Sequence, residues 1–310
     1  MKNKYLKPRS ERQMRACIGM DVARFNLLSE LFEKEYKCQE GICYFEMIDN
    51  LNLCHQIPFS DYKDIVFFVL FCNKAGNTFD VLGFIFDMDG PTAHTNLTKF
   101  RPILQQALIR SGDAPVREVS SLEDMKKIGE NGSDIMIDAS EIIIERRKNK
   151  EFRDKSFSGK KKGYRLKVTI ISSYHKRITY LGGLFFGSVH DYTVLKIEFP
   201  ILKKYFALFC ILLDLGYLGF GKDYDSMVLY IPHKKPRKSK ENPNPQLTDV
   251  QKAENKAMSQ RRIVVENALA GLKRYHIISN RIRLKKMKYI DETLYLCASL
   301  WNFYLSYKKC

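Results

Sequence analysis

The sequence lacks any long hydrophobic segment. Its longest apolar runs, residues 65–72 and 205–213, fall well short of the roughly 20 residues that a membrane-spanning helix needs. Residues 1–15 are polar and basic and contain no apolar stretch of the kind that an export signal carries. The sequence therefore predicts an intracellular protein with no membrane partner.

Paired cysteines are also missing. Eight cysteines are scattered along the chain, and none forms a Cys-x-x-Cys pair. Without an export signal we expect them to be reduced, buried side chains rather than disulfides. A metal cluster of Cys38, Cys43, Cys54 and His55 is an alternative, but its spacing fits no standard zinc pattern.

Positive charge is what the sequence has in excess, with a formal net charge of +17. Residues 146–168 carry eleven Lys or Arg against two Asp or Glu, and residues 233–288 carry sixteen against four. Such local positive fields favour a polyanionic partner, most often nucleic acid. One basic stretch alone is more often solvated surface, but these two stretches flank candidate acidic residues.

The first third of the chain has helical patterns. A helix from about residue 61 to 75 is expected, capped by Ser60 and ending near Gly76. Thr78 then caps a short helix, Asp89-Gly90 forms a turn, and Pro91 lies in the first turn of a helix that reaches residue 108.

Two helices joined by a tight turn fit a helix-turn-helix over about residues 61–108, although an ordinary helical hairpin fits equally well. In a helix-turn-helix, the exposed start of the second helix would contact DNA. Its candidate DNA-binding residues are Thr92, His94, Thr95, Asn96 and Lys99.

From residue 134 the pattern changes to short β-branched runs. Residues 134–138, 166–172, 177–182, 209–214 and 227–231 predict strands, with helices between them. A long helix over residues 249–275 begins with a capping box of Thr248 and Gln251. Its apolar stripe is formed by Val250, Ala257, Val264, Ala268 and Leu272. The sequence thus predicts a helical region over residues 1–113 and an α/β domain over residues 114–310.

Three acidic residues stand out within this pattern. Asp138 and Asp214 each end a predicted strand, and strand ends of α/β sheets are where ligands bind. Glu266 shares one stripe of the long helix with Asn255, Arg262 and Lys273. Each acid alone is readily explained as a strand end or a helix surface charge, but together they would form an oxygen-rich site for Mg²⁺ or Mn²⁺.

Such a site suits phosphodiester chemistry. Two metal ions can activate an attacking oxygen and stabilise a leaving oxygen. Arg262 and Lys273 would then hold phosphate oxygens, unless Arg262 simply pairs with Glu266 one turn away on the helix surface.

Blocks of sequence around these residues follow one another in a specific order. They are residues 137–141, 157–162 and 167–168, then 187–191, then 213–219, then 232–236, 247–248, 255, 261–266 and 273. Any one block is weak, but in this order they resemble the DDE transposases of the insertion-sequence-five family and their Harbinger-like relatives. The resemblance covers about residues 60–285.

The resemblance implies an α/β fold, a ribonuclease H-like mixed sheet with flanking helices, preceded by an all-α helix-turn-helix domain. It implies two divalent ions, Mg²⁺ or Mn²⁺, held by Asp138, Asp214 and Glu266 as the catalytic residues. The expected reaction cuts double-stranded DNA at an element's terminal inverted repeats and joins the freed 3′-hydroxyl ends to a target site.

Pairing two element ends implies a homodimer or larger assembly on DNA. The expected compartment is the bacterial cytoplasm, or the nucleus for a eukaryotic source.

The motifs also suggest supporting roles. Arg262 and Lys273 match a Tyr-Arg-Glu-Lys signature of related families, with Ser259 at its Tyr position, and Arg146-Arg147 stands shifted from a common Arg-Pro pair. His190 and Asp191 match a His-Asp motif that either supports a metal-binding carboxylate or caps the following helix. Five further lysines are expected to contact DNA phosphates: Lys160, Lys161, Lys162, Lys234 and Lys235.

A non-catalytic DNA-binding protein derived from a transposase is the main alternative. All three acidic positions are present, which favours the enzyme, but the enzyme hypothesis fails if the three carboxyl groups do not converge within reach of a shared pair of metal ions.

Overall fold

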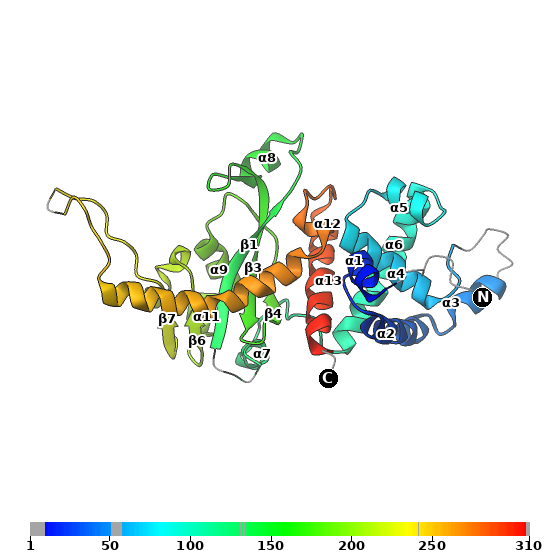
Figure 1. Ribbon diagram of the computed structural model, residues 1–310, viewed down its shortest axis with the longest axis horizontal. Coiled ribbons are helices and arrows are strands. Elements are labelled where there is room, and N and C mark those ends of the chain that lie inside the picture. Colours follow the sequence, from blue (N-terminus) through cyan, green and yellow to red (C-terminus); the bar gives the residue numbers. More distant parts are fainter. Residues whose placement is uncertain (1–9, 51–57, 131, 133, 241, 308–310) are drawn as a thin grey trace. The chain divides into compact units, whose positions relative to one another are not determined.

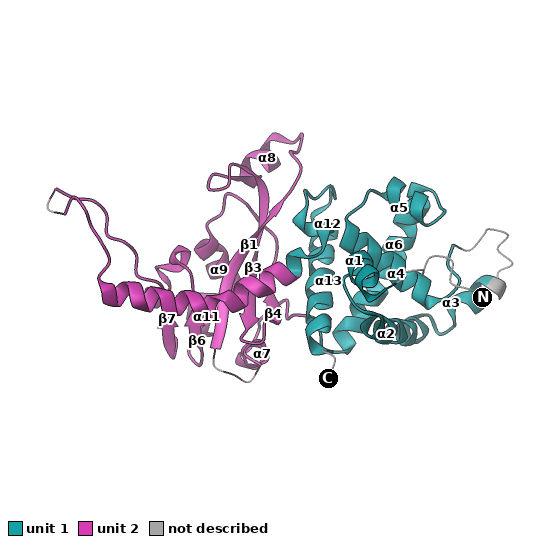
Figure 2. Ribbon diagram, in the orientation of Figure 1, with its two compact units in different colours: residues 1–114, 272–310 teal, residues 115–271 magenta. Residues whose placement is uncertain are grey.

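A computed structural model of the 310-residue chain describes residues 10–50, 58–130, 132, 134–240 and 242–307 (Figure 1). The chain forms two compact units, residues 1–114 with 272–310 and residues 115–271 (Figure 2). The α/β domain was predicted to extend over residues 114–310. In the structure, residues 272–310 group with the helical unit.

Helices alone make up the described part of the first unit. They are α1 (Glu11–Ile18), α2 (Val22–Glu40), α3 (Tyr44–Asn50), α4 (Tyr62–Ala75), α5 (Phe79–Ile85), α6 (Gly90–Arg110), α12 (His276–Ser279) and α13 (Met287–Ser306). Large aromatic side chains fill the core, since Phe32, Phe68, Phe86 and Phe100 are fully buried. Helix α12 packs on α4, and α13 packs on α6, which ties the C-terminal segment into this unit.

Local capping explains where these helices begin and end. The cap of α4 is Asp61, which accepts the Asp64 N–H at 2.9 Å, so the predicted Ser60 cap is wrong. Gly76 ends α4 with a φ of +66°, as expected of a glycine at that position.

The predicted pair of helices with a tight turn is present as α5 and α6. Thr78 accepts the Val81 N–H, and Asp89 accepts the Thr92 N–H at 2.7 Å, with Pro91 in the first turn of α6. The expected short helix, turn and longer helix are therefore confirmed as local structure.

The second unit contains one seven-stranded mixed sheet among the described residues. Its central order is β2-β3-β1-β6-β7, with β4 and β5 paired to β3. The strands are β1 (Asp134–Ile143), β2 (Phe157–Ser158), β3 (Gly163–Ser173), β4 (Ile178–Leu181), β5 (Phe185–Phe186), β6 (Cys210–Leu212) and β7 (Val228–Tyr230). All five predicted strands are confirmed, and the two-residue strands β2 and β5 were not predicted.

Strand β1 runs antiparallel to β3 and parallel to β6, which runs parallel to β7. The long β1–β3 pair extends beyond the rest of the sheet toward α8 (Lys150–Ser156) (Figure 1). The other helical elements of this unit are α7 (Leu122–Ile128), α9 (Asp191–Glu198), η1 (Ile201–Lys203), η2 (Leu215–Tyr217), α10 (Phe220–Asp223) and α11 (Asp249–Lys273).

The two faces of the sheet have separate cores. Ile135 and Ile137 of β1, with Ile211 of β6, pack in the larger cluster together with residues of α7, α9 and α10. Met136 and Leu212 point to the opposite face and pack against Val265 of α11. Helix α11 therefore covers the face that even-numbered β1 residues occupy, as its course across the sheet in Figure 1 shows.

The described cysteines are free, as predicted. Only Cys72 and Cys297 are buried, and Cys38 is exposed, so the expectation that the cysteines are buried is wrong for part of the set. Cys54 and His55 of the alternative metal cluster lie outside the described residues.

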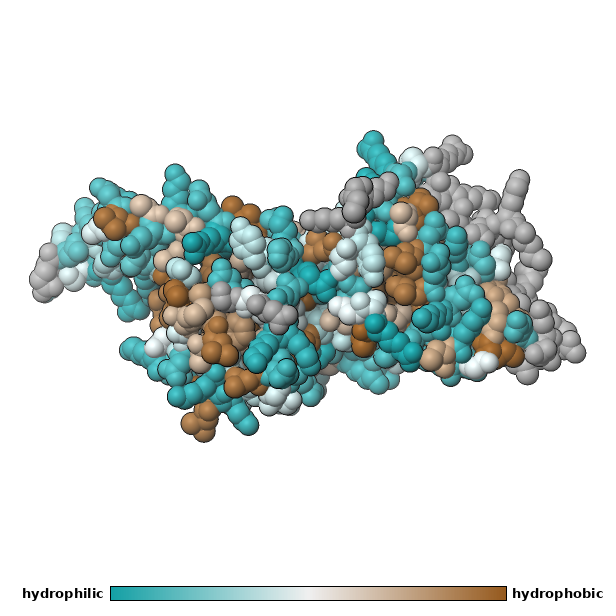
Figure 3. Space-filling view, turned by 90° about the horizontal axis from the view of Figure 1, so that it is seen from below, coloured by the Kyte–Doolittle hydropathy of each residue, from teal (hydrophilic) through white to brown (hydrophobic). Residues whose placement is uncertain are grey.

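No helix within the described ranges is both long and apolar enough to span a bilayer. On the molecular face shown in Figure 3, hydrophilic residues surround smaller groups of hydrophobic ones.

Candidate active site

Asp138 and Asp214 occupy matching positions along the neighbouring parallel strands β1 and β6. Met136 of β1 and Leu212 of β6 form the last residue pair between the two strands. Asp138 comes two residues after Met136, within β1, and Asp214 comes two residues after Leu212, just past the end of β6. Side chains alternate along a strand, so Asp138 shares the face of Met136, which α11 covers. Asp214 follows the end of β6 and caps η2 by accepting the Gly216 N–H at 3.0 Å.

Neighbouring charges act on the carboxyl group of Asp138. Burial raises the pKa of the Asp138 carboxyl, and a 2.8 Å hydrogen bond from the Ala139 N–H lowers it. The guanidinium of Arg262 also lowers this pKa, whereas the carboxylates of Asp214 and Asp191 raise it. Asp138 thus lies within a group of negative charges that a cation would stabilise.

Tyr217 lies among the same acids and was missed by sequence reasoning. It is 1% exposed, and its hydroxyl has no hydrogen-bond partner. Burial raises the pKa of this hydroxyl, and the carboxylates of Asp138, Asp191 and Asp214 raise it further. The signal in the sequence was its place in the Asp214 motif, three residues after the acid.

Asp191 of the His-Asp motif pairs with a buried lysine. Lys167 of β3 is 7% exposed, and its Nζ lies 2.9 Å from Asp191 Oδ1 and donates to the Val189 carbonyl at 2.6 Å. His190 is the N-cap residue of α9, but its side chain makes no capping hydrogen bond. Asp191 is the first residue of that helix, so of the two suggested roles side-chain capping is absent and Asp191 instead forms an ion pair.

The Lys167 ammonium also faces Glu141 on the neighbouring strand. The two residues are directly paired in the β1–β3 register, with Nζ and Oε1 3.9 Å apart. Glu141 further lies 3.4 Å from the Arg165 guanidinium and accepts the Ser158 hydroxyl at 3.1 Å. A connected charge network therefore joins β1, β3 and the start of α9 beside Asp138.

Glu266 comes from α11, one residue after Val265, which packs on the sheet. The Glu266 side chain is exposed, and the described residues contain no group of three or more His, Cys, Asp or Glu that could hold a metal ion. The expected convergence of three carboxyl groups is thus absent from the side chains as they stand. Among the described residues, Arg262 and Glu266 do not form the ion pair that was the alternative. The Arg262 guanidinium instead lowers the pKa of Asp138.

The donor set that the structure does bring together suits a hard cation. Mg²⁺ is commonly held by one or two carboxylates while keeping several waters and substrate oxygens. The prediction that Asp138 ends a strand is wrong, because β1 continues to Ile143 through its pairing with β3. Asp138 within β1 and Asp214 just after β6 supply two such carboxylates, and the Tyr217 hydroxyl, which has no hydrogen-bond partner among the described residues, lies close enough for both charges to act on it.

The first half of α11 does not pack against the sheet through the predicted apolar stripe. The capping box is confirmed, since Thr248 and Gln251 exchange hydrogen bonds of 3.0 and 3.2 Å. The predicted apolar stripe is wrong in this half, because Val250 is 68% exposed. Asn255 instead holds the chain after β7 by bonding both the N–H and the carbonyl of His233, at 2.7 and 3.0 Å.

The lysines expected to contact DNA are exposed, but lie in two places. Lys160, Lys161 and Lys162 form the turn between β2 and β3, near α8. Lys234 and Lys235 follow the His233 anchor in the segment that extends beyond the start of α11 (Figure 1). Lys273, the last residue of α11, is exposed and belongs to the helical unit.

The α6 candidates occupy the first three turns of that helix. Thr92, His94, Thr95 and Lys99 are exposed, and Asn96 is half-buried. The His94 ring packs edge-on against Phe79, with centroids 4.9 Å apart, and the Lys99 ammonium lies 4.8 Å from the centre of the Tyr44 ring.

Comparison with known proteins gives two matches. Residues 137–302 match the family described as DDE superfamily endonuclease. A probable transposase for insertion sequence element IS702 from Microchaete diplosiphon is 29% identical over 177 residues, covering 56% of this chain and 58% of that relative. The chain thus spans less than two thirds of this relative's length, and no solved structure matches it.

Proposed function

We propose, because this chain belongs to the DDE superfamily endonucleases, that it is a metal-dependent DNA transposase of the insertion-sequence-five type. In this proposal it has a ribonuclease H-like fold, cuts double-stranded DNA at the terminal inverted repeats of a mobile element and joins the 3′-hydroxyl ends to target DNA. The observation that supports the proposal is the placement of Asp138 and Asp214, each two residues beyond the last residue pair between the parallel strands β1 and β6, with Asp138 on the face that α11 covers.

Asp138 and Asp214 would hold the metal ions, with Glu266 as the third carboxylate from α11. When bound, two Mg²⁺ or Mn²⁺ ions would activate the attacking oxygen and stabilise the leaving oxygen. Arg262, whose charge already acts on Asp138, would bind a phosphate oxygen of the DNA strand at the site. Lys167 would fix Asp191 and the start of α9 beside Asp138 through its ion pair.

The exposed basic residues would hold the DNA backbone. Lys160–Lys162 and Lys234–Lys235 are exposed, so their ammonium groups would be accessible to phosphates and would contribute affinity rather than sequence recognition. Helices α5 and α6 would act as a helix-turn-helix that reads the element ends through the exposed start of α6. A homodimer or larger complex would pair the two ends.

The test is cleavage of a supercoiled plasmid that carries the element's ends, in the presence of Mg²⁺. Asp138→Asn should lower cleavage more than about 100-fold, because even residues that only support metal ligands affect activity by 10- to 100-fold. Asp134→Asn is the matched control. Asp134 is an exposed acid four residues earlier on the same strand, and its replacement should leave cleavage within about twofold of wild type.

Equal cutting by wild type and Asp138→Asn would refute the assignment of this carboxylate. A wild-type chain that binds the ends but neither nicks nor cuts them would support instead a non-catalytic protein derived from a transposase.

A further inference from the structure

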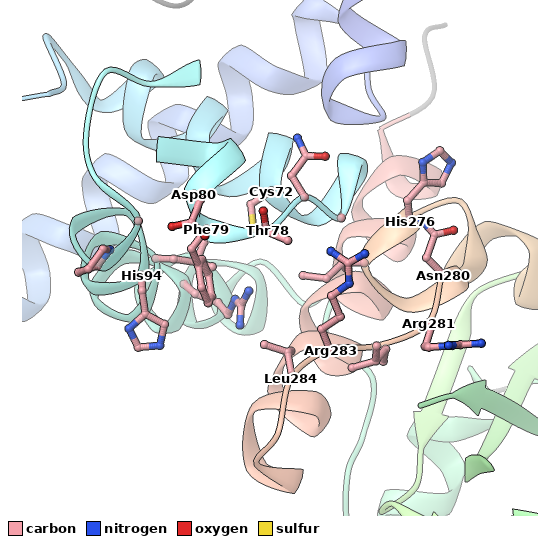
Figure 4. A pocket seen from close by; sticks show the side chains of 18 residues that line it. Cys72, Thr78, Phe79, Asp80, His94, His276, Asn280, Arg281, Arg283 and Leu284 are labelled. Carbon is pink, nitrogen blue, oxygen red and sulfur yellow. The ribbon is translucent and has the colours of Figure 1, made fainter. Parts of the chain in front are cut away.

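The helical unit contains a cavity of about 470 Å³ that is built from its residues alone. Its walls come from the start of α5, the start of α6 and the segment from α12 to Leu284 (Figure 4). The volume lies within the roughly 300–1,000 Å³ that is typical of small-molecule sites. None of the metal-binding candidates lines it.

Arg101 gives this cavity a buried positive charge. The residue lies on α6, is 8% exposed and lines the cavity together with an adjoining one of about 220 Å³. Its Nη1 donates to the Thr293 hydroxyl at 3.1 Å, but Nε and Nη2 have no hydrogen-bond partner. A buried guanidinium with two free donors is costly unless an anion completes it.

The acids that line the two cavities do not supply that anion. Asp80 is on the wall of the larger cavity and Glu292 on that of the smaller one. Among the described residues neither forms an ion pair with Arg101, and Glu292 lies 3.8 Å from Lys288 instead. The charge of Arg101 is therefore available to a ligand.

A second cation and an apolar wall lie around the same space. In Figure 4 the Arg283 side chain extends toward Thr78 across the cavity, whereas Arg281 points away from it. Phe79, Leu97 and Ile282 supply apolar surface. Inorganic phosphate would satisfy the guanidinium groups but would leave most of this surface uncovered.

We propose that this cavity binds a nucleotide, with its phosphate on Arg101 and Arg283 and its base or sugar against Phe79, Leu97 and Ile282. The nucleotide is either free or a single unit of a DNA strand, since both present the same phosphate and nucleoside. The inference goes beyond the proposed nuclease function and does not depend on Asp138 or on a metal ion.

Calorimetric titration of the full chain in EDTA tests the proposal while keeping the metal site out of the measurement. The probes are deoxynucleoside 5′-monophosphates, the same nucleosides without phosphate, inorganic phosphate and a short single-stranded oligonucleotide. We expect the mononucleotide to bind at least tenfold more tightly than nucleoside or inorganic phosphate, since hydrogen bonds to charged groups typically contribute a tenfold or larger factor. Binding of the oligonucleotide alone, with loss on Arg101→Met, would identify the DNA strand as the source.

Arg101→Met should weaken binding at least tenfold while leaving the melting temperature of the free chain equal to or above that of wild type. That second result separates an uncompensated cation from an arginine that merely holds the fold. Arg283→Gln should weaken binding about fivefold, and Arg281→Gln, from the same segment but pointing away, should leave it within about twofold.

Three results would overturn the proposal. The first is that the phosphate-free nucleoside binds as tightly as the mononucleotide. The second is that the mononucleotide does not bind and that Arg101→Met leaves the affinity for the oligonucleotide unchanged. If Arg101→Met fails to fold, the decision passes to Arg283→Gln, and binding unchanged in that variant refutes the site.

Discussion

Replacing Lys167 with Met tests the charge network beside Asp138. Lys167 is 7% exposed, and its ammonium lies 2.9 Å from Asp191 and 3.9 Å from Glu141. Methionine fills much of the volume of the aliphatic stem and removes the charge, so the change reports on the ion pairs rather than on packing.

The size of the effect follows from burial. Removing one partner of a fully buried ion pair typically costs about 3–5 kcal/mol. The cost here should be smaller, because the Asp191 side chain is 27% exposed and Glu141 keeps its contacts with Arg165 and Ser158. We expect a loss of about 2 kcal/mol, which for a unit of about 150 residues lowers the melting temperature by about 4–8 °C.

Thermal unfolding of the full chain measures this loss, and a double-mutant cycle assigns it. Asp191→Asn combined with Lys167→Met should be less destabilising than the sum of the two single changes, with a coupling of about 1 kcal/mol. Lys155→Met is the control, because the Lys155–Glu151 pair is exposed on α8 and exposed pairs contribute little. Additive single effects, or a loss no greater than in the control, would refute the network.

Three further changes test other parts of the structure. Gly76→Ala should cost about 3 kcal/mol by urea unfolding, because φ is +66° and the added Cβ would lie 2.8 Å from the His276 backbone, whereas Gly41→Ala, at φ +71° with open space around it, should cost only about 1 kcal/mol. Burial raises the pKa of Glu198, so the stability it contributes is full below its unfolded pKa of about 4.3 and is lost as pH rises through the folded value. Glu198→Gln should therefore gain melting temperature relative to wild type between pH 4 and 7, and a constant difference would contradict this. Thr248→Ala should cost about 1 kcal/mol of helix stability, measured as faster amide exchange in the first turn of α11, and unchanged exchange there would show that the cap is not needed.

Caps and turns could be predicted because they depend on adjacent residues. Thr78, Asp89 and the Thr248–Gln251 box are placed as the sequence indicates. The Ser60 cap failed for an equally local reason. The helix begins one residue later, at the Asp61 cap, and sequence alone does not decide which of two neighbouring polar side chains is the cap.

The burial of residues along α11 and the cavity at Arg101 could not be predicted, because both depend on long-range packing. The helical wheel of α11 describes which residues are apolar, but not how far the sheet extends beneath them. Val250 is consequently 68% exposed, while Val265, outside the predicted stripe, is buried on Met136 and Leu212. The cavity at Arg101 was equally out of reach, because its walls come from segments about 180 residues apart.

The three proposed catalytic acids differ in the same way. Asp138 and Asp214 could be predicted to lie near each other because the register of β1 and β6 fixes where their backbones lie, and strand alternation fixes the face of Asp138. The position of Glu266 depends on the rotation of α11, which Val265 sets by packing on the sheet. Arg262 lies one turn before Glu266 on the same helix face, and its charge already acts on Asp138. One turn is about 5.4 Å, so we expect a change of the Glu266 side-chain rotamer, rather than a shift of α11, to bring its carboxylate to the Asp138–Asp214 pair.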